Sequence, residues 1–522
     1  MISAVRRPAD YLRPHDRVAW VVVVSTALIG AILRVTYALS GGLWRDEAQA
    51  LGIAAIPSAG EMIRFLAAHE SHPPLYYLIL RGWVSVLGGS DVSALALSLV
   101  FGVALIPAVY LVTAAIHSPR AGVLASVLSS VHPGLIQYSG SVRPYSLLSF
   151  LAVILVYLVW CVLREQPKPK HLLGYAVVAL AMLYVHHWAW LVVGAGGLVW
   201  LAIGLKRRGV YEVRNIALAH LGVGIAYSPW VPSLLHQVRS AGHPRVGASA
   251  IAATMQSLFA ITWVPPAAAG ILLGTSLWVY LSWGRGQSNK DQRLALGIAA
   301  SIPILAAAMT VLLSPFLNLV TLWCYSIVSG PYLIAVSALI SQHGDGKSAV
   351  RSWALGVAWV VVSAAIWFQL QAAPRSNVRD VANRMQTLIT GNDRVVVVPG
   401  YVVPAFYRYL GPGQRVSSLP EDSLAPYIAY DSRVARDLDP RPWVRLMAMI
   451  DSSKGRCERV WVVVEAGTPP HLLRLVAGFL EEARGRLGPP NMVDSSPPRP
   501  GALEHANLRV YHPCTRTPGL PQ

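Results

Sequence analysis

The chain has 522 residues, of which 54% are hydrophobic and only 13% are charged. This charged share is roughly half of that in soluble proteins, and with a mean hydropathy of +0.48 it excludes a disordered chain, a fibrous repeat and an ordinary cytosolic enzyme. A net charge of +18 would suggest nucleic acid in a soluble protein, but in so apolar a chain the basic residues are first read as membrane-topology signals, and no nucleic-acid partner is expected.

Eleven apolar runs are each long enough to cross a bilayer as a helix, which takes about 20 residues. They cover roughly 18–39, 92–117, 121–139, 145–163, 171–187, 188–205, 215–235, 262–283, 293–314, 319–340 and 351–370. The first run is too long for the core of a cleaved signal peptide and therefore predicts a signal anchor. Arg34, near its outer end, is expected to snorkel toward the membrane surface.

Segment 73–88 is short and carries Arg81 in its middle, so it reads either as a span or as an interfacial helix. With an interfacial helix, the cytoplasmic segments hold 17 Lys and Arg and the outer loops hold 6, as the positive-inside rule requires. If segment 73–88 crossed the membrane instead, the basic segments 164–170 and 206–214 would lie outside, against this rule. We therefore predict a polytopic α-helical protein with about eleven spans, a cytoplasmic N-terminus and interfacial helices in a first outer loop over 40–91.

The composition changes after about residue 370, because the last 152 residues hold 19 of the 43 Lys and Arg and 14 of the 25 Asp and Glu. We expect two domains, a transmembrane catalytic domain over 1–370 and a small soluble extracytoplasmic α/β domain over 371–522. In the second, the predicted elements are buried strands over 393–398 and 459–464, helices over 377–390 and 471–485, and a loop over 489–501.

The predicted topology concentrates the outer-face acids of the membrane domain in the first outer loop. These are Asp46, Glu47, Glu61, Glu70 and Asp91. Asp46 and Glu47 are adjacent and follow the first span directly, where carboxylates are costly and usually functional. A solvated helix start capped by Asp46 is the alternative interpretation.

Three further motifs place polar groups on the same face. His72 precedes two prolines and Tyr76, Arg143 precedes Tyr145 at the start of a span, and His186 ends a span. A guanidinium at such a place can bind phosphate bidentately. A rigid turn, a snorkelling arginine and an interfacial histidine are the ordinary alternatives. The convergence of all these motifs on one face predicts a site for a lipid-linked anionic substrate.

Several motifs in order resemble the GT-C superfamily of membrane glycosyltransferases, and within it glycosyltransferase family 39, which includes protein O-mannosyltransferases and lipid A aminoarabinose transferases. The motifs are LWRDEA, HPPLYY, YSGSVRPYSLL, LYVHHWAW, AYSPWVPSLLHQ and the tail pattern NVRDVANRM, NDRVVVVPG and RVWVVV. They extend over about 40–480, nearly the whole chain. The resemblance implies a GT-C fold and inverting transfer of a hexosyl or pentosyl group from a polyprenyl-phosphate sugar to an envelope acceptor, which is a lipid, a glycan or a protein.

The resemblance also implies roles for individual residues. Asp46 would be the general base, supported by Glu47. His72, Arg143 and His186, with Tyr76 and Tyr145 beside them, would bind the substrate and its phosphate. A divalent metal ion is a candidate cofactor, and Glu70, His72 and His186 are its candidate ligands. The short outer loops suggest a bacterial member in the cytoplasmic (inner) membrane, with the lipid bilayer, the lipid-linked donor and the acceptor as its partners.

Two readings from other classes stay open, a transporter or flippase of lipid-linked sugars and a catalytically inactive scaffold. A transporter should carry ionisable residues in mid-span and inverted repeats, and we find neither an acid in mid-span nor a repeat. The scaffold reading rests on departures from the family pattern, such as Ser141 where many relatives carry an acid. Pairing of Cys457 with Cys514 is also left open by the sequence.

Overall fold

The structure is a computed structural model that divides the chain into two compact units. It describes residues 17–164, 168–240, 290–313, 326–342, 346–371, 375–410, 416–419, 427, 440–466, 470–494 and 505–514. One unit, here called the helical unit, comprises Met1–Ala38, Leu66–Val86 and Val92–Gln369, and the other, the sheet unit, comprises Leu39–Phe65, Leu87–Asp91 and Leu370–Gln522. The sheet unit therefore includes two stretches of the predicted first outer loop besides the C-terminal part of the chain.

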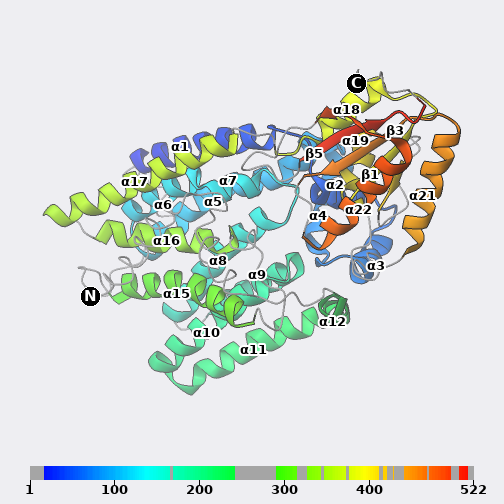
Figure 1. Cartoon of the computed structure of the whole chain (residues 1–522). Coiled ribbons are helices and arrows are strands. Elements are labelled where there is room, and N and C mark those ends of the chain that lie inside the picture. The colour runs from blue at the N-terminus through cyan, green and yellow to red at the C-terminus, as the bar shows by residue number, and fades with distance from the viewer. Residues whose placement is uncertain are drawn as a thin grey trace. The chain divides into compact units, whose positions relative to one another are not determined.

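Where the structure describes it, the helical unit consists of helices (Figure 1). Its elements lie wholly or mainly within it and are α1 (Arg17–Ala38), α4 (Leu75–Leu87), α5 (Asp91–Ile116), α6 (Pro119–Val131), α7 (Pro133–Ser139), α8 (Tyr145–Arg164), α9 (Pro169–Val185), α10 (Ala189–Arg208), α11 (Val210–Tyr227), η3 (Ser228–Trp230), α12 (Val231–Ser240), α15 (Lys290–Leu313), α16 (Ser326–Gln342) and α17 (Gly346–Gln371). Within the described ranges, five are long and apolar enough to cross a membrane, namely α1, α5, α8, α10 and α15. Shorter apolar helices lie in α4, α9, α16 and α17.

Two of the predicted spans differ from the structure in continuity. The run over 121–139 is two helices, because α6 ends at Val131 and Pro133 begins α7. Proline has no backbone N–H and cannot continue the hydrogen bonds of the preceding turn. The run over 215–235 likewise ends as an α-helix at Tyr227. The predicted span 262–283 lies outside the described residues, so the count of eleven spans stays a prediction.

Arg34 does not snorkel but is fully buried in the helical unit. Its Nη2 donates to the carbonyl oxygen of Ser129 at 2.9 Å, and its Nη1 donates to that of Ser130 at 2.9 Å. In a continuous helix the Ser129 carbonyl would accept from residue 133, which is proline. Arg34 therefore supplies the donor that Pro133 lacks, as expected of a buried cation that pairs with backbone carbonyls inside a membrane protein.

Helix α5 packs closely against the end of α7. A Cβ atom added at Gly102 would lie 2.0 Å from the Oγ of Ser139, so this position has room only for hydrogen. The same Ser139 Oγ accepts a hydrogen bond from the Nε of Arg34 at 3.3 Å. Helices α1 and α5 together therefore fix the end of α7, four residues before Arg143.

The sheet unit is a mixed sheet with helices on both faces. Its elements are α2 (Arg45–Ala54), α3 (Ala59–His69, shared with the helical unit), α18 (Val378–Leu388), β1 (Arg394–Val398), η5 (Gly400–Val402), α19 (Val403–Leu410), β2 (Val416–Ser418), α21 (Pro440–Gly455), β3 (Val460–Glu465), α22 (Pro470–Leu487), β4 (Asn491–Asp494) and β5 (Ala506–Tyr511). The strand order is β2-β1-β3-β5-β4. Strands β1 and β3 pair in parallel with Val396 opposite Val462, and β5 runs antiparallel to β3.

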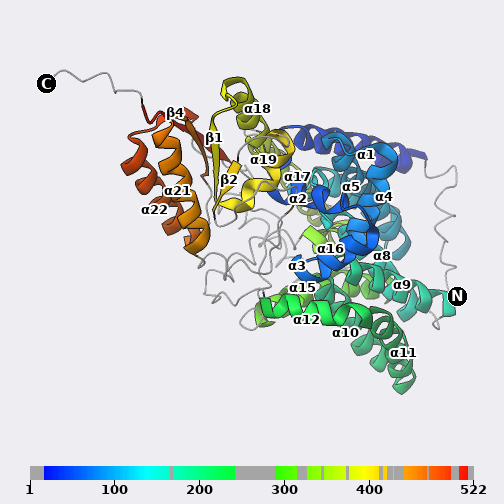
Figure 2. The ribbon, with the colours of Figure 1, turned by 90° about the vertical axis from the view of Figure 1, so that its right-hand side faces the viewer.

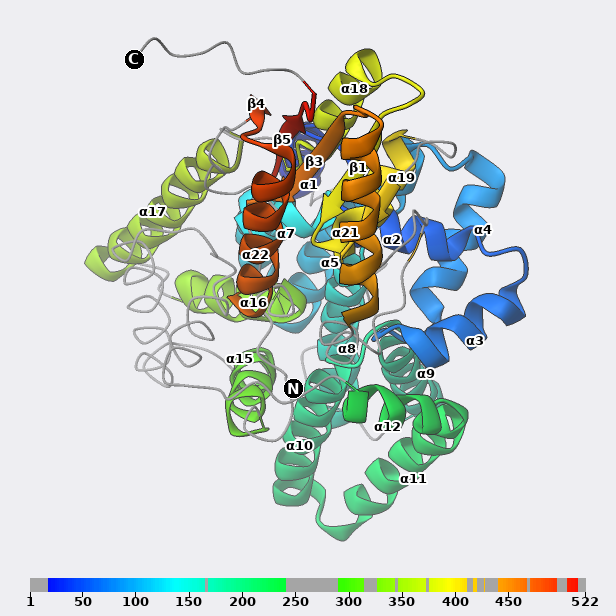
Figure 3. The ribbon, with the colours of Figure 1, turned by 45° about the vertical axis from the view of Figure 1, so that its right-hand side comes forward.

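The valine runs of β1 and β3 are apolar without interruption because both faces of the sheet are covered. Alternate residues point to opposite faces. Val395, Val397, Trp461 and Val463 pack in one core with α18 and α19, and Val396, Val398, Val460, Val462 and Val464 pack in another with α21 and α22. Figure 2 shows the two helix pairs on opposite sides of the strands, and Figure 3 shows α21 and α22 side by side.

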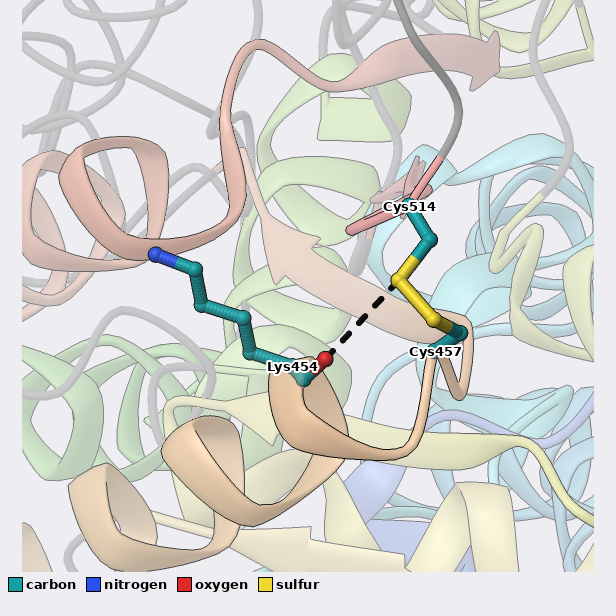
Figure 4. Close-up of a disulfide and its surroundings, with 3 residues drawn as sticks. All are labelled: Lys454, Cys457 and Cys514. Atoms are coloured by element: carbon teal, nitrogen blue, oxygen red, sulfur yellow. Dashed lines mark hydrogen bonds between the residues drawn. A yellow bond between two sulfur atoms is a disulfide. The ribbon is translucent and has the colours of Figure 1, made fainter.

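The predicted strands and helices of the C-terminal part are confirmed, with one exception. The segment 489–501 was expected to be a loop, but residues Asn491–Asp494 form the edge strand β4. This strand is short and contains few of the β-branched residues that mark a strand in the sequence. Cys457, just after α21, forms a disulfide with Cys514, just after β5 (Figure 4).

Candidate functional site

Three connections of the helical unit bring predicted phosphate-binding residues together with Glu70, a predicted metal ligand. Glu70 and His72 lie between α3 and α4, Arg143 lies just before α8, and His186 lies between α9 and α10. Each of these four residues is less than a tenth exposed. The structure thus assembles, inside one unit, polar residues that are far apart in the sequence, and we call them the Arg143 cluster.

The core of the Arg143 cluster is a chain of two hydrogen bonds through His72. Its Nδ1 lies 2.9 Å from Oε1 of Glu70 and its Nε2 lies 3.0 Å from Nη2 of Arg143. Because arginine can only donate hydrogen bonds, Nε2 of His72 accepts and Nδ1 carries the proton that it donates to Glu70. The ring is therefore neutral in this arrangement and links a carboxylate to a guanidinium.

Glu70 is ionised in this arrangement. Its Oε1 also accepts from the backbone N–H of Ser71 at 3.0 Å. Burial raises the pKa of Glu70, but the hydrogen bond from His72, the charge of Arg143 and the Ser71 N–H outweigh it and lower the pKa to about 2. The carboxylate keeps its negative charge at any physiological pH and fixes the ring of His72.

Ser98 of α5 forms a hydrogen bond with the backbone of Arg143. Its Oγ donates to the carbonyl oxygen of Arg143 at 3.2 Å and lies 3.2 Å from the hydroxyl of Tyr76. Tyr76, which the sequence placed among the substrate-binding residues, is 1% exposed. Its hydroxyl therefore positions Ser98 in this structure.

His186 is the fourth member of the Arg143 cluster, and Tyr145 lies beside it. The rings of His72 and His186 are 4.9 Å apart, and Tyr145 lies 5.8 Å from His186. The Nδ1 of His186 accepts the backbone N–H of Trp188 at 3.0 Å, so a neutral ring carries its proton on Nε2 and can donate from there. The guanidinium of Arg143 lies 5.9 Å from the centre of the Tyr145 ring, within the range of a cation–π contact.

Two side chains of helix α12 form hydrogen bonds with the backbone just before Glu70. The Nε2 of Gln237 donates to the carbonyl oxygen of Leu66 at 3.0 Å, and the Nε2 of His236 lies 3.2 Å from that of Ala68. The Oε1 of Gln237 lies 2.6 Å from Nε2 of His187. The AYSPWVPSLLHQ motif therefore supports the site through its last two residues.

The three candidate metal ligands do not fit a metal ion in this arrangement. In the residues that the structure describes, no group of three or more His, Cys, Asp or Glu is placed to hold one. Both ring nitrogens of His72 are used in hydrogen bonds, and Nδ1 of His186 accepts a backbone N–H. A histidine binds a metal through a free lone pair, which these hydrogen bonds occupy. The donor N–H groups of Arg143 and His186 suit an anion instead.

The two adjacent carboxylates lie in the sheet unit, at the start of α2, and their surroundings differ. Glu47 is fully buried, forms an ion pair with Arg375 and accepts the backbone N–H of Trp44 at 3.1 Å. Glu47, and not Asp46, therefore caps this helix. The Asp46 side chain is 25% exposed and its Oδ1 lies 3.7 Å from Nε of Arg45.

Sequence reasoning missed Ser98, Arg375 and Glu465, which hold predicted site residues in place. Arg375 pairs with a residue 328 positions away and Ser98 has no motif around it, so no local signal could have found them. Glu465, which binds Arg45 at 2.6 Å, directly follows the predicted strand 459–464. A carboxylate at the end of a parallel strand is a recognisable site position, so this residue had a usable signal.

Comparison with known proteins gives a family match in the helical unit. Residues 71–235 match the family described as dolichyl-phosphate-mannose-protein mannosyltransferase. This segment includes His72, Arg143 and His186 but not Asp46. A comparison with curated proteins gave no sequence match.

Solved structures give a similarity over almost the whole chain. The structure of ArnT from Cupriavidus metallidurans bound to undecaprenyl phosphate aligns with a TM-score of 0.56 at 10% identity, over 94% of this chain and 98% of that one. An oligosaccharyltransferase from Archaeoglobus fulgidus tethered with an acceptor peptide aligns with a TM-score of 0.46 at 13% identity, over 92% of this chain and 73% of that one. The second score is too low to support an argument.

The family match and the structural similarity both test the family resemblance that was inferred from the ordered motifs. The family match rests on sequence and the ArnT similarity shows the fold. The resemblance is confirmed: this multi-pass membrane protein has the fold of the GT-C glycosyltransferases and, over residues 71–235, matches the dolichyl-phosphate-mannose-protein mannosyltransferase family.

Proposed function

We propose that the chain is an inverting glycosyltransferase that moves a sugar from a polyprenyl-phosphate-linked donor to an envelope acceptor, a lipid, a glycan or a protein. The observation that carries this proposal is the Arg143 cluster, in which the buried guanidinium of Arg143 and the buried ring of His186, with its donor N–H, both lie against His72. Such donors suit a phosphate whose negative charge grows as it leaves. The ArnT structure was solved with undecaprenyl phosphate bound, a ligand of the class proposed here.

The proposed step is a single displacement at the anomeric carbon. The oxygen of the acceptor hydroxyl forms the new glycosidic bond while the bond between the anomeric carbon and the phosphate oxygen breaks. The acceptor proton passes to the Asp46 carboxylate, and polyprenyl phosphate leaves with its bonding electron pair. Attack opposite to the leaving group inverts the configuration.

Asp46 is the better of the two carboxylates for the role of base. A base must come within hydrogen-bond reach of the proton it takes. The Asp46 side chain is 25% exposed, whereas Glu47 is fully buried against Arg375. Asp46 and the Arg143 cluster belong to different units, and the order of motifs shared with the family is what joins them in one reaction.

The proposed orientation puts the N-terminus in the cytoplasm and the sheet unit outside, in a bacterial cytoplasmic (inner) membrane. Two observations support it, the excess of Lys and Arg on the predicted inner side and the Cys457–Cys514 disulfide. Disulfides persist in oxidising compartments outside the cytoplasm. A cysteine introduced at the exposed Glu481 of α22 should react with a membrane-impermeant maleimide in intact spheroplasts. Labelling only after lysis would reverse the orientation.

The function is tested with purified protein in nanodiscs, a panel of polyprenyl-phosphate sugars and envelope extract as the acceptor. We expect release of polyprenyl phosphate from one donor, insensitive to EDTA. Asp46→Asn should lower release at least about 100-fold, since general base catalysis contributes roughly 10²–10⁴. Asp380→Asn is the matched control, because Asp380 is an aspartate of the same unit and its side chain is 65% exposed.

The other outcomes decide between the alternatives. A donor that crosses the bilayer of a liposome without releasing polyprenyl phosphate would favour the transporter or flippase. Neither release nor transport would favour the inactive scaffold. Full activity of Asp46→Asn would refute the assignment of the base, and loss of activity with EDTA, restored by a metal, would refute our argument that the Arg143 cluster binds an anion alone.

A further inference from the structure

We propose that the sheet unit positions the catalytic loop, and that Glu465 is the residue through which it does so. The loop is defined here as residues 42–47, and it contains Asp46. This inference rests on the proposed function, because it assigns a positioning role around the proposed base. It gives the C-terminal part of the chain a positioning role in the reaction.

The backbone of the catalytic loop is held first at its beginning. The N–H of Gly42 donates to the carbonyl oxygen of Ser376 at 3.3 Å, and the N–H of Leu43 donates to the hydroxyl of Tyr409 at 2.6 Å. Tyr409 in turn donates to Oδ2 of Asp91 at 2.8 Å, so its hydroxyl has a fixed direction. Two consecutive backbone groups of the loop are therefore set by the C-terminal part of the chain.

The end of the catalytic loop is held by a buried ion pair. The guanidinium of Arg375 binds Glu47, and neither side chain is exposed. The same Glu47 oxygen accepts the N–H of Trp44, which closes the first turn of α2. Ala48 follows it into the core formed with α18 and α19. The start of α2 is thus fixed in rotation, and with it the direction of the neighbouring residues.

Glu465 holds the middle of the catalytic loop through Arg45. Its Oε1 accepts from Nη1 of Arg45 at 2.6 Å, and its Oε2 accepts from the hydroxyl of Tyr401. The guanidinium of Arg45 also lies over the ring of Tyr401, 4.4 Å from its centre. Both carboxylate oxygens are used, so Glu465 fixes Arg45 in one place.

Asp46 lies between these fixed neighbours. Its Oδ1 is 3.7 Å from Nε of Arg45, whose opposite end is bound to Glu465. This contact is already an ion pair, but a long one. Were Arg45 released from Glu465, its guanidinium could close on Asp46 in a shorter, hydrogen-bonded pair, which would hold the carboxylate back from taking a proton. Glu465 therefore keeps the carboxylate of Asp46 in place and accessible, although it is a positioning residue that touches no reacting atom.

The test compares Glu465→Gln with Glu458→Gln. Glu458 is a matched control, because it precedes the same strand β3 at its other end and pairs with Arg394 of β1 at 3.2 Å. The two arginine partners are equally exposed, at 22% each. Hydrogen exchange of the peptide over residues 41–50 and the kcat and KM for the donor are measured for both variants.

We expect Glu465→Gln to raise exchange over residues 41–50 at least fivefold and to lower kcat about tenfold or more, with the donor KM within twofold. Glu458→Gln should change none of these. Tyr401→Phe keeps the ring under Arg45 and removes only the hydroxyl, so it should give a smaller effect in the same direction. Tyr401→Phe also provides the test of the inference if Glu465→Gln does not fold.

Three outcomes overturn the inference. They are unchanged exchange over residues 41–50 in both Glu465→Gln and Tyr401→Phe, an equal loss of activity in Glu458→Gln, and a loss expressed in KM alone. If the wild-type protein releases polyprenyl phosphate from no donor, the proposed function fails. The exchange measurement still decides whether Glu465 holds the loop, because it needs no activity.

Discussion

Replacing Arg34 should destabilise the helical unit strongly, because its guanidinium is fully buried and hydrogen-bonded. Its guanidinium donates to the carbonyl oxygens of Ser129 and Ser130, where Pro133 interrupts the helical ladder between α6 and α7. We therefore expect Arg34→Met to leave both carbonyls without that donor. Methionine fills a similar length, so the lost hydrogen bonds should dominate over lost packing.

The expected magnitude follows from these two carbonyls. Leaving a buried acceptor unsatisfied costs roughly 1–3 kcal/mol, so losing the donor to two carbonyls in Arg34→Met should lower the free energy of unfolding by about 2–6 kcal/mol. Arg34→Lys should cost less, because one ammonium can still reach one of the two carbonyls. A lysine has no planar fork, however, and cannot serve Ser129, Ser130 and Ser139 together.

The assay is equilibrium unfolding of the purified protein in mixed micelles, followed by tryptophan fluorescence. Arg17→Met is the matched control, because Arg17 begins the same helix α1 and is exposed. Its change should stay within about 0.5 kcal/mol. If Arg34→Met unfolds within the same margin of the wild type, Arg34 does not replace the donor missing at Pro133 and the reasoning is refuted.

Three further predictions concern both units. The Cys457–Cys514 disulfide closes a loop of 57 residues, so reduction should lower the free energy of unfolding of the sheet unit by up to about 4 kcal/mol, measured by thermal unfolding with and without dithiothreitol. Gly102→Leu should prevent the close packing of α5 on Ser139 and give protein that is retained poorly in the membrane fraction, whereas Gly82→Leu, at a position with nothing within 4 Å, should be tolerated. The depressed pKa of Glu70 contributes stability above its usual value of 4.5, and this is lost as the pH falls toward about 2. The stability difference between wild type and Glu70→Gln should therefore shrink over that pH range and stay constant from pH 5 to 8.

The elements that the sequence predicted well are those with a strong local pattern. The valine runs within 393–398 and 459–464 form β1 and β3, because β-branched residues favour strands and so apolar a strand suits a sheet that is covered on both faces. The edge strand β4 pairs on one side only and has no such pattern. Its residues NMVD look like the loop around them, so periodicity could not reveal it.

The break at Pro133 shows a different limit of sequence reasoning. The run over 121–139 is apolar throughout, and length and hydropathy favoured one span. The proline was the available signal, since a proline inside a helical pattern ends or kinks the helix. What the sequence could not supply was Arg34, which reaches the break from α1 and makes it stable.

The sequence predicted which residues belong to the candidate site, but not the hydrogen bonds between them. The motifs around His72, Arg143 and His186 named the members of the cluster that the helical unit assembles. Which nitrogen accepts and which donates depends on Glu70 and on the backbone N–H of Trp188. These hydrogen-bond directions favour an anion over a metal ion, and they are set only when the chain has folded.

Asp46 and Glu47 show how much the fold adds to a motif. Residue type alone does not separate these two neighbouring carboxylates, and only the family resemblance favoured Asp46 as the base. In the structure Glu47 accepts from Arg375 and from the N–H of Trp44 and has no exposed surface. To take a proton it would have to leave Arg375 as an uncompensated buried charge, at a cost of roughly 3–5 kcal/mol. Glu47 is therefore suited to holding the loop, and Asp46, partly exposed beside it, is the carboxylate that remains suited to the chemistry.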